Sequence, residues 1–336
     1  MRLSIGHFLK FALAPMLLAV SFAAVPASSV AADASDVTAA FDRTFGTQPR
    51  TIPTYDDPFQ AQVMHLASPD QGRIGVAAYD LASGRSIAVL GDQPFPMAST
   101  SKVAIAATFL EMVDAGRYKL TDQIPLMVPV ASRKFAGPVA PVRPGTLISA
   151  QGLIDLALTR SSNPATDALL AAVGGPKAVN DFLRRAGLSG LRLDRDIATL
   201  VRDDGAVNPA TTIDPRDSAT PMAMVRLLAG LHRGQWLSPE SRAVLMSAMA
   251  RCETGKHRIP GLLPGVSILH KTGTLANTAS DIGIINMPDG RAVALAIYVT
   301  GQAGKPHRDA RIAEIARAIY NGYLFNTATM SRTVAR

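Results

Sequence analysis

Cysteine is almost absent from this chain of 336 residues, which limits what can hold the fold together. The only cysteine, Cys252, cannot form an internal disulfide bond, so it is interpreted as a packing residue. The six histidines show no HExxH or paired-ligand spacing, and no glycine-rich phosphate-binding stretch follows a strand. We therefore expect no metal, no nucleotide and no redox cofactor.

Long apolar runs are also lacking, apart from one near the N-terminus. Residues 1–32 combine two basic residues, an apolar run over 11–25 and a small-residue sequence that ends at Ala32. This pattern is typical of a cleaved secretion signal, with Ala27 as a second cleavage point. The run contains Pro15 and is shorter than the roughly 20 residues of a spanning helix, which argues against an uncleaved anchor. We expect a periplasmic or secreted protein without a stable membrane span after cleavage.

The formal net charge of +8 falls by two, to +6, when the signal is removed. On an exported protein this positive charge favours attraction to anionic polymers of the cell envelope. An ordinary solvated basic surface explains the charge equally well. We expect no nucleic-acid partner and a monomer. The remaining residues, 33–336, are enough for one catalytic domain with a large core or with two closely packed subdomains.

Three short motifs follow one another along the chain: SxxK at 99–102, SSN at 161–163 and KTG at 271–273. Each motif alone is a weak signal, because serine and lysine are common, but this order and spacing are not expected by chance. Together they are typical of an acyl-transfer site. In such a site Ser99 is the nucleophile, and Lys102 lowers the cost of its deprotonation.

The segment from Lys102 to about Gly116 is apolar nearly all round, which predicts a helix buried at the centre of the protein. Ser99 lies at the first turn of this helix, where unpaired N–H groups and partial positive charge favour an oxyanion. Lys102 follows at the i+3 position on the same face, within reach of the hydroxyl. A lysine that is buried beside polar partners can lose its proton near neutral pH and act as a base.

Strand patterns near both ends of the chain enclose a series of helical patterns. The expected strands are 73–79, 86–90, 267–271, 281–285 and 292–298. The expected helices are 59–67, 149–158, 164–172, 177–186, 221–231, 239–250 and 309–323, with Ser149 and Ser238 as N-caps. Five prolines between 123 and 145 predict an irregular, loop-rich crossing there.

These elements predict an α/β (α+β) fold with a five-stranded antiparallel sheet formed by both ends of the chain. Helices would flank the sheet, and an all-helical subdomain would be inserted into it. The sheet subdomain would comprise about 59–98 and 264–325, and the helical subdomain about 99–263. The site would lie at their junction.

At its motifs the chain resembles the class A β-lactamases and their relatives among the serine penicillin-binding proteins. The likeness runs from about Arg73 to Tyr323 and includes FPMA before the nucleophile and HKTGT around the third motif. It implies the same fold and an acyl-enzyme mechanism. By this resemblance, Ser161 passes a proton to the leaving nitrogen, and Asn163 holds the catalytic lysine and the substrate amide.

The resemblance also assigns the residues that bind the substrate. Lys271 and Thr272 would bind the carboxylate that β-lactams and D-Ala-D-Ala peptides share, and Gly273 would let a substrate backbone approach the strand edge. Thr274 would donate the second N–H of the oxyanion hole, with Ser99 donating the first.

Arg258 follows a Thr-Gly pair, as it does in family members that place an arginine near the substrate carboxylate. Ser280 stands at the other place where relatives keep that arginine. A salt bridge to a structural partner is an equal alternative for Arg258.

Glutamate is the second scarce residue, and its scarcity bears on the reaction. Class A enzymes carry a glutamate and an asparagine that hold the deacylating water, in a loop that begins with leucine, aspartate and arginine. Here LDR at 193–195 is followed by Ile197 and Val201 at those two positions, and none of the four glutamates of the chain lies in this loop. Neither side chain can polarise water, so hydrolysis of the acyl-enzyme is expected to be slow.

Aspartates are the possible substitutes for the missing glutamate. Asp196, Asp203 and Asp204 lie in the same loop, although Asp196 is one position early and has a shorter side chain. By the resemblance, Arg195 and Asp217 close the base of this loop with an ion pair.

We predict an exported serine hydrolase that forms an acyl-enzyme with β-lactams at Ser99 and hydrolyses the β-lactam amide. The first alternative is a D-alanyl-D-alanine carboxypeptidase or transpeptidase that acts on peptidoglycan, because such relatives also lack the glutamate. The second is a covalent β-lactam sensor or trap without turnover.

Overall fold

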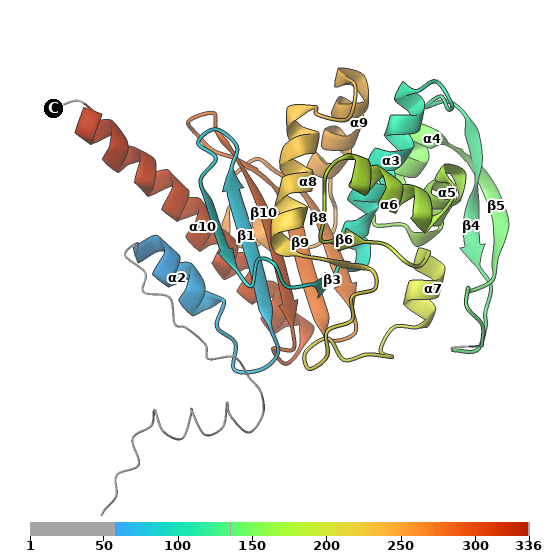
Figure 1. Cartoon of the computed structure of the whole chain (residues 1–336), viewed down its shortest axis with the longest axis horizontal. Helices are drawn as coiled ribbons and strands as arrows, with labels where there is room; N and C mark the ends of the chain where they lie inside the picture. The colour runs from blue at the N-terminus through green and yellow to red at the C-terminus, as the bar shows by residue number, and fades with distance from the viewer. Residues whose placement is uncertain (1–57, 135, 335–336) are drawn as a thin grey trace, which may run out of the picture. The chain divides into compact units, whose positions relative to one another are not determined.

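The main sheet is five-stranded, antiparallel and formed by both ends of the chain, which confirms the sequence prediction. In the computed structural model, which describes residues 58–134 and 136–334, its strand order is β2-β1-β10-β9-β8 (Figure 1). The strands are β1 (Ile74–Asp80), β2 (Ser86–Val89), β8 (Ile268–Leu275), β9 (Thr278–Asn286) and β10 (Ala292–Thr300). The signal predicted at 1–32 lies outside the described residues. β8, which carries the KTG motif, is an edge strand.

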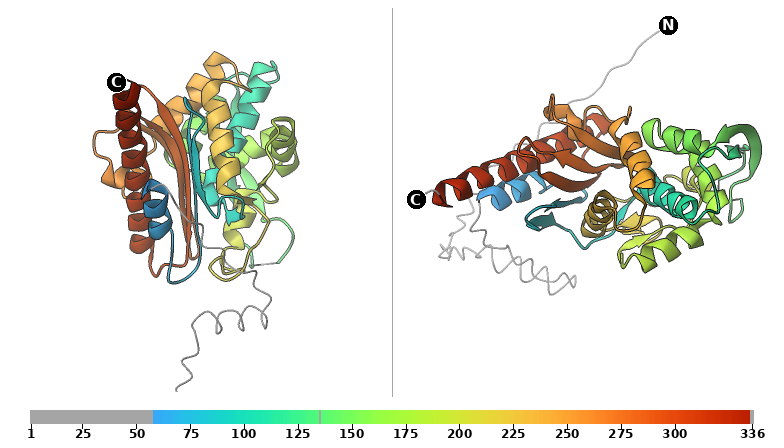
Figure 2. Two further views of the ribbon diagram at one scale, coloured as in Figure 1. Left: turned by 60° about the vertical axis from the view of Figure 1, so that its left-hand side comes forward. Right: turned by 90° about the horizontal axis from the view of Figure 1, so that it is seen from above.

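Helices cover both faces of this sheet. Helices α2 (Pro58–Leu66) and α10 (Lys305–Val334) pack on one face, and α8 (Pro221–Arg233) packs on the other (Figure 2). Consecutive residues of β10 therefore alternate between two hydrophobic clusters: Leu295 faces α2 and α10, whereas Ala296 faces the side of α8. Because both faces are buried, the strand is apolar along its whole length.

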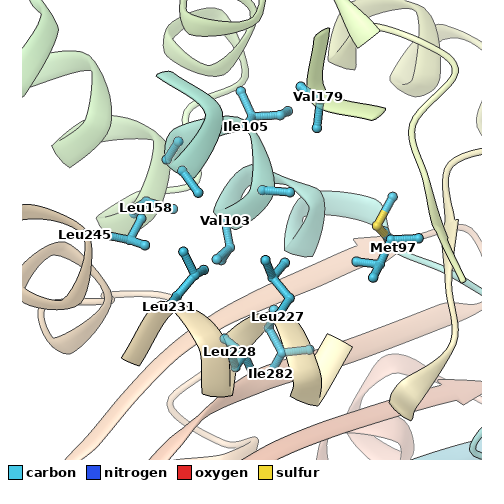
Figure 3. Packing of buried hydrophobic residues seen from close by; sticks show 14 of the residues in the cluster. Met97, Val103, Ile105, Leu158, Val179, Leu227, Leu228, Leu231, Leu245 and Ile282 are labelled. Carbon is cyan, nitrogen blue, oxygen red and sulfur yellow. The ribbon is translucent and has the colours of Figure 1, made fainter. Parts of the chain in front are cut away.

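The helix predicted at the centre of the protein is α3 (Lys102–Asp114), and its residues 102–110 are all buried. It follows directly on one turn of 3-10 helix, η1 (Ala98–Ser101). Side chains of the surrounding helices enclose Val103 and Ile105 (Figure 3). These helices are α4 (Ala150–Thr159), α6 (Pro176–Arg185), α8 and α9 (Pro239–Ala250), and α5 (Asn163–Val173) also packs against α3. The rigid core thus fixes the position of the SxxK motif.

The predicted N-caps are confirmed. The Ser149 hydroxyl accepts the N–H of Gly152, and the Ser238 hydroxyl accepts the N–H of Ser241, both at 3.1 Å. In the part of the chain that the structure describes, no helix combines the length and apolarity that a membrane crossing needs.

The prediction of an irregular crossing over 123–145 is wrong. Residues there form most of a two-stranded antiparallel ribbon of β4 (Gln123–Pro129) and β5 (Val142–Ser149). A ribbon of two strands leaves one edge of each strand unpaired, so a proline without an N–H is tolerated where that N–H would face outward. The pairing register of the ribbon shifts between Pro125 and Met127, so the ladder is interrupted there.

The inserted subdomain is therefore not all-helical. Besides this ribbon, it holds β6 (Leu191–Arg192) and β7 (Ser218–Ala219), which join β3 (Phe95–Pro96) in a small sheet. A short helix, α7 (Ile197–Arg202), begins where the water-activating glutamate is expected, and η2 (Ile259–Leu262) precedes β8.

Candidate active site

Ser99 lies in η1, at the N-terminal end of the buried helix α3. Its neighbours hold this turn, because the Thr100 hydroxyl donates to Met97 O at 2.7 Å and the Ser101 hydroxyl donates to Ala98 O at 2.8 Å. Ala98 has a φ of 48°, a left-handed conformation that costs a residue with a Cβ about 1–3 kcal/mol. The surrounding core keeps Ser99 in this strained turn.

Lys102 is completely buried, and its amine is surrounded by acceptors. Its Nζ lies 2.7 Å from Ser161 O, 2.7 Å from Asn163 Oδ1 and 3.2 Å from Ser161 Oγ. Burial and then the positive charge of Lys271 lower the pKa of Lys102 to about 6, against the opposing effect of Asp167. A neutral amine keeps two N–H groups for the two shortest contacts and leaves its lone pair for a proton.

The Ser161 hydroxyl lies between two amines, since Lys271 Nζ donates to it at 2.9 Å from the other side. Burial is the main cause that lowers the pKa of Lys271 to about 8; Cys252 and Asp281 oppose the shift. The site can therefore hold a neutral and a charged amine on either side of one hydroxyl near pH 7. Such a hydroxyl can relay a proton between them.

The start of α5 presents the second motif. Ser162 is the N-cap of this helix and accepts the N–H of Ala165 at 3.3 Å, so it stabilises the turn where the family usually has aspartate. Ser161 has a φ of 57°. This left-handed conformation accompanies the contact of its carbonyl oxygen with Lys102 Nζ.

The third motif lies on β8, which runs close past η1. A Cβ on Gly273 would lie 2.6 Å from Met97 O and 2.5 Å from Ser280 Oγ, closer than real Cβ contacts. The glycine is thus needed for the packing of β8 against the turn that carries Ser99. The sequence suggested a different reason, the approach of a substrate backbone. The Thr272 hydroxyl contacts the Thr254 hydroxyl at 2.6 Å.

Arg258 is 2% exposed and forms a 2.7 Å ion pair with Asp309. The alternative of a structural ion pair is therefore present in the structure. The same guanidinium also donates to the Thr274 hydroxyl at 2.7 Å and to the carbonyl oxygens of Gly273 and Ser280. Arg258 thus fixes the Thr274 side chain as well as two backbone segments.

The loop that begins near residue 193 contains no water-activating pair. Ile197 is 2% exposed at the start of α7, whereas Val201 is 48% exposed. The expected ion pair at the base of the loop is confirmed, with Arg195 Nε 2.6 Å from Asp217 Oδ2.

The three aspartates considered as substitutes already bind other groups. Asp196 caps α7 through the N–H of Thr199 at 2.7 Å. Asp203 forms a 2.7 Å ion pair with Arg202, and Asp204 accepts the N–H of Ala276.

Comparisons with known proteins agree with this geometry. Residues 58–323 match the profile of the β-lactamase enzyme family. The β-lactamase CTX-M-6 of Salmonella typhimurium is 32% identical over 275 residues, which cover 79% of this chain and 89% of that protein. The chain belongs to the class A β-lactamase family. The extended-spectrum β-lactamase PER-1 of Pseudomonas aeruginosa is 26% identical over 280 residues, covering 80% and 89%.

Solved structures of class A β-lactamases have the same fold. An ancestral class A β-lactamase matches with a TM-score of 0.68 and 35% identity, covering 78% of this chain and 99% of that one. A β-lactamase from Xanthomonas campestris pv. campestris has a TM-score of 0.68 and 30% identity, covering 79% and 97%. The protein is therefore a β-lactamase-like serine hydrolase of class A.

The sequence reasoning missed one buried carboxylate beside this class A site, Asp167. It lies four residues after Asn163 on α5, hence on the same helix face, and is 4% exposed. Its two oxygens accept the N–H groups of Ile197 at 2.7 Å and of Ala198 at 2.9 Å. Burial raises the pKa of Asp167 to about 6, against the backbone hydrogen bonds and the charge of Lys102. The i, i+4 spacing from the SSN motif is the sequence signal that could have found it.

We predict that Gly273→Ala lowers both stability and activity, because the added methyl group forces β8 away from η1. Overpacking of this kind typically costs about 1–3 kcal/mol. Thermal unfolding and the rate of acylation by a penicillin measure the two effects. Gly304→Ala, whose Cβ would make only an ordinary contact at 3.6 Å, is the control. Equal behaviour of the two variants would contradict the close approach.

The pH dependence of acylation should be bell-shaped. The neutral form of Lys102 accepts the proton, so the rate should rise as pH increases through about 6. The charged form of Lys271 attracts a carboxylate, so the rate should fall as pH increases through about 8. Stopped-flow acylation across this range measures both limbs.

Asp167→Asn should move the acid limb to lower pH, because the loss of a negative charge lowers the pKa of Lys102. It should also destabilise the protein by about 1–3 kcal/mol, since an amide accepts only one of the two N–H groups. Asp196→Asn removes a charge from the loop that contacts Asp167 but keeps an oxygen that caps α7, so the acid limb of this variant should stay in place. An unshifted limb in Asp167→Asn would show that this carboxylate is only structural.

Proposed function

We propose that this class A family member is an exported enzyme that is acylated by β-lactams at Ser99 and hydrolyses them slowly. The observation that carries the proposal is the buried amine of Lys102, which Ser161 and Asn163 hold three residues after the proposed nucleophile. Export rests on the signal-like N-terminus, and action as a monomer is part of the same proposal.

In the acylation step, Ser99 Oγ attacks the lactam carbonyl carbon while its proton passes to neutral Lys102. The N–H groups of Ser99 and Thr274 stabilise the oxyanion. The proton then moves from the lysine through the Ser161 hydroxyl to the lactam nitrogen, and the C–N bond breaks. The 3.2 Å contact between Lys102 Nζ and Ser161 Oγ supports this route.

The substrate carboxylate would bind at Lys271 and Thr272. Charge attraction comes from the Lys271 ammonium, and a hydrogen bond comes from the Thr272 hydroxyl. The Thr274 hydroxyl lies nearby on β8, and Arg258 orients it by donating at 2.7 Å. Arg258 thus acts as a positioning residue, and Asn163 would bind the substrate amide.

Hydrolysis of the acyl-enzyme needs an activated water, and the loop offers no free carboxylate for it. Removal of a positioned general base typically costs about 10²–10⁴ in rate. Lys102 is the remaining base that can accept a proton from water after acylation. We infer that acylation is fast relative to deacylation.

The lack of a free carboxylate in this loop also supports an alternative function. A peptidoglycan D-alanyl-D-alanine peptidase or transpeptidase also works without the glutamate, because an acyl-peptide is mobile enough to admit water or an amine by another route. A covalent sensor or trap would show the acyl-enzyme without its release. The lifetime of the penicillin adduct, combined with an assay for D-Ala release, separates these functions.

Ser99→Ala should abolish acylation altogether. We expect the intact mass of the wild-type protein to increase by one penicillin after exposure to the drug, and the variant to keep its original mass. Ser101→Ala is the matched control, because its hydroxyl donates to Ala98 O within the same turn. A wild-type protein that stays unmodified under saturating drug would contradict the proposed function.

Ile197→Glu should shorten the adduct lifetime if residue 197 faces the acyl group as the family register implies. The new carboxylate would lie beside Asp167, which binds the N–H of residue 197, and two like charges raise each other's pKa. The double variant with Asp167→Asn should therefore deacylate faster than Ile197→Glu alone. Unchanged lifetimes in both variants would show that the register is wrong.

A further inference from the structure

At the free edge of β8, a contact with another segment of the chain bears on which substrates can bind. β8 pairs with β9 on one side only, and Leu275 pairs with Thr278 at the end of the hairpin. Successive amides of a strand point to opposite edges. Ala276 is the first turn residue after the last residue of β8, Leu275, so its N–H points to the same edge as the N–H of Thr274. A substrate that extends along this edge past Thr274 would meet the Ala276 N–H next.

That next donor is already occupied. The Ala276 N–H donates to both carboxylate oxygens of Asp204, at 2.9 and 3.0 Å. Asp204 belongs to the segment between α7 and β7.

Two further contacts hold this segment in place. Asn277 Nδ2 donates to Asn208 Oδ1 at 2.8 Å, on the turn that follows β8. On the opposite side, Lys134 from the tip of the β4–β5 ribbon donates to the Asp204 carbonyl oxygen at 2.7 Å. The segment thus connects the ribbon tip to the end of β8, and Asp204 contacts both, through Lys134 at the ribbon and Ala276 after β8.

We infer that Asp204 blocks substrate binding along the edge of β8 beyond Thr274. The enzyme therefore favours β-lactams with compact acyl substituents. An extended acyl group or peptide cannot pair with the Ala276 N–H, because the carboxylate holds it. The carboxylate also places a negative charge there, which repels anionic substituents. This inference rests on the proposed function and narrows its substrate class.

Asp204→Ala tests the inference through a ratio of substrates. Benzylpenicillin represents a compact acyl group, and a cephalosporin with a branched oxyimino substituent represents a bulky one. We expect the variant to acylate with benzylpenicillin within about twofold of the wild-type rate, and with the bulky cephalosporin about tenfold faster. The ratio of the two rates should therefore change by about an order of magnitude.

Two matched variants separate the contact from a general effect on the loop. Asp204→Asn keeps an oxygen that can accept the Ala276 N–H, so its substrate ratio should stay near that of the wild type. Asp214→Ala removes a carboxylate of the same segment that binds Arg216 locally, and its ratio should also stay unchanged. Thermal unfolding verifies that each variant is folded.

Hydrogen exchange at the Ala276 amide gives a readout that needs no activity. The amide should be protected in the wild type, Asp204→Asn and Asp214→Ala, and should exchange faster in Asp204→Ala. Unchanged protection in Asp204→Ala, or equal rate changes for both substrates, would overturn the inference. Failure of the wild type to react with any β-lactam would instead overturn the proposed function, and the exchange result would still show whether Asp204 holds the edge.

Discussion

The burial of one amine, that of Lys102, is the constraint on which the rest of this site depends. A charged ammonium in an apolar core is costly, and the protein meets this cost by favouring the neutral amine and surrounding it with acceptors. The acceptors come from Ser161 and Asn163, which lie some sixty residues further along the chain. This arrangement requires that α3 and the start of α5 keep fixed positions relative to each other. The large core between them holds them there.

Backbone strain is also present at this site. Ala98 and Ser161, which flank the nucleophile and the lysine, both adopt left-handed backbone conformations without being glycine. A glycine occurs instead at position 273, where β8 passes so close to η1 that a side chain does not fit. Three elements from distant parts of the sequence are thereby brought together around Ser99: the 3-10 turn, the start of α5 and the edge strand β8.

The sequence allowed prediction of the features that depend on local pattern. The three motifs, the central apolar helix, the strands at both ends and the serine N-caps all follow from residue type and spacing. The ribbon at 123–149 was missed because prolines are read as breakers, although a two-stranded ribbon has outward edges that accept them. Asp167 was missed and Asp204 was assigned only as a possible base, because their observed roles arise from contacts with residues about thirty and seventy positions away. The i, i+4 spacing places Asp167 on the same helix face as Asn163, but the contacts themselves have no local sequence signal.

We propose that the site is equipped for acylation and poorly equipped for deacylation. Ile197 replaces the expected water-activating carboxylate, and the nearby aspartates bind the backbone or arginine instead. The most direct test is rapid mixing of the wild-type enzyme with excess chromogenic cephalosporin. We expect a burst of about one product per enzyme followed by a much slower steady rate, because acyl-enzyme accumulates. Rapid linear turnover without a burst would contradict the claim, since it would show that deacylation is not the slow step.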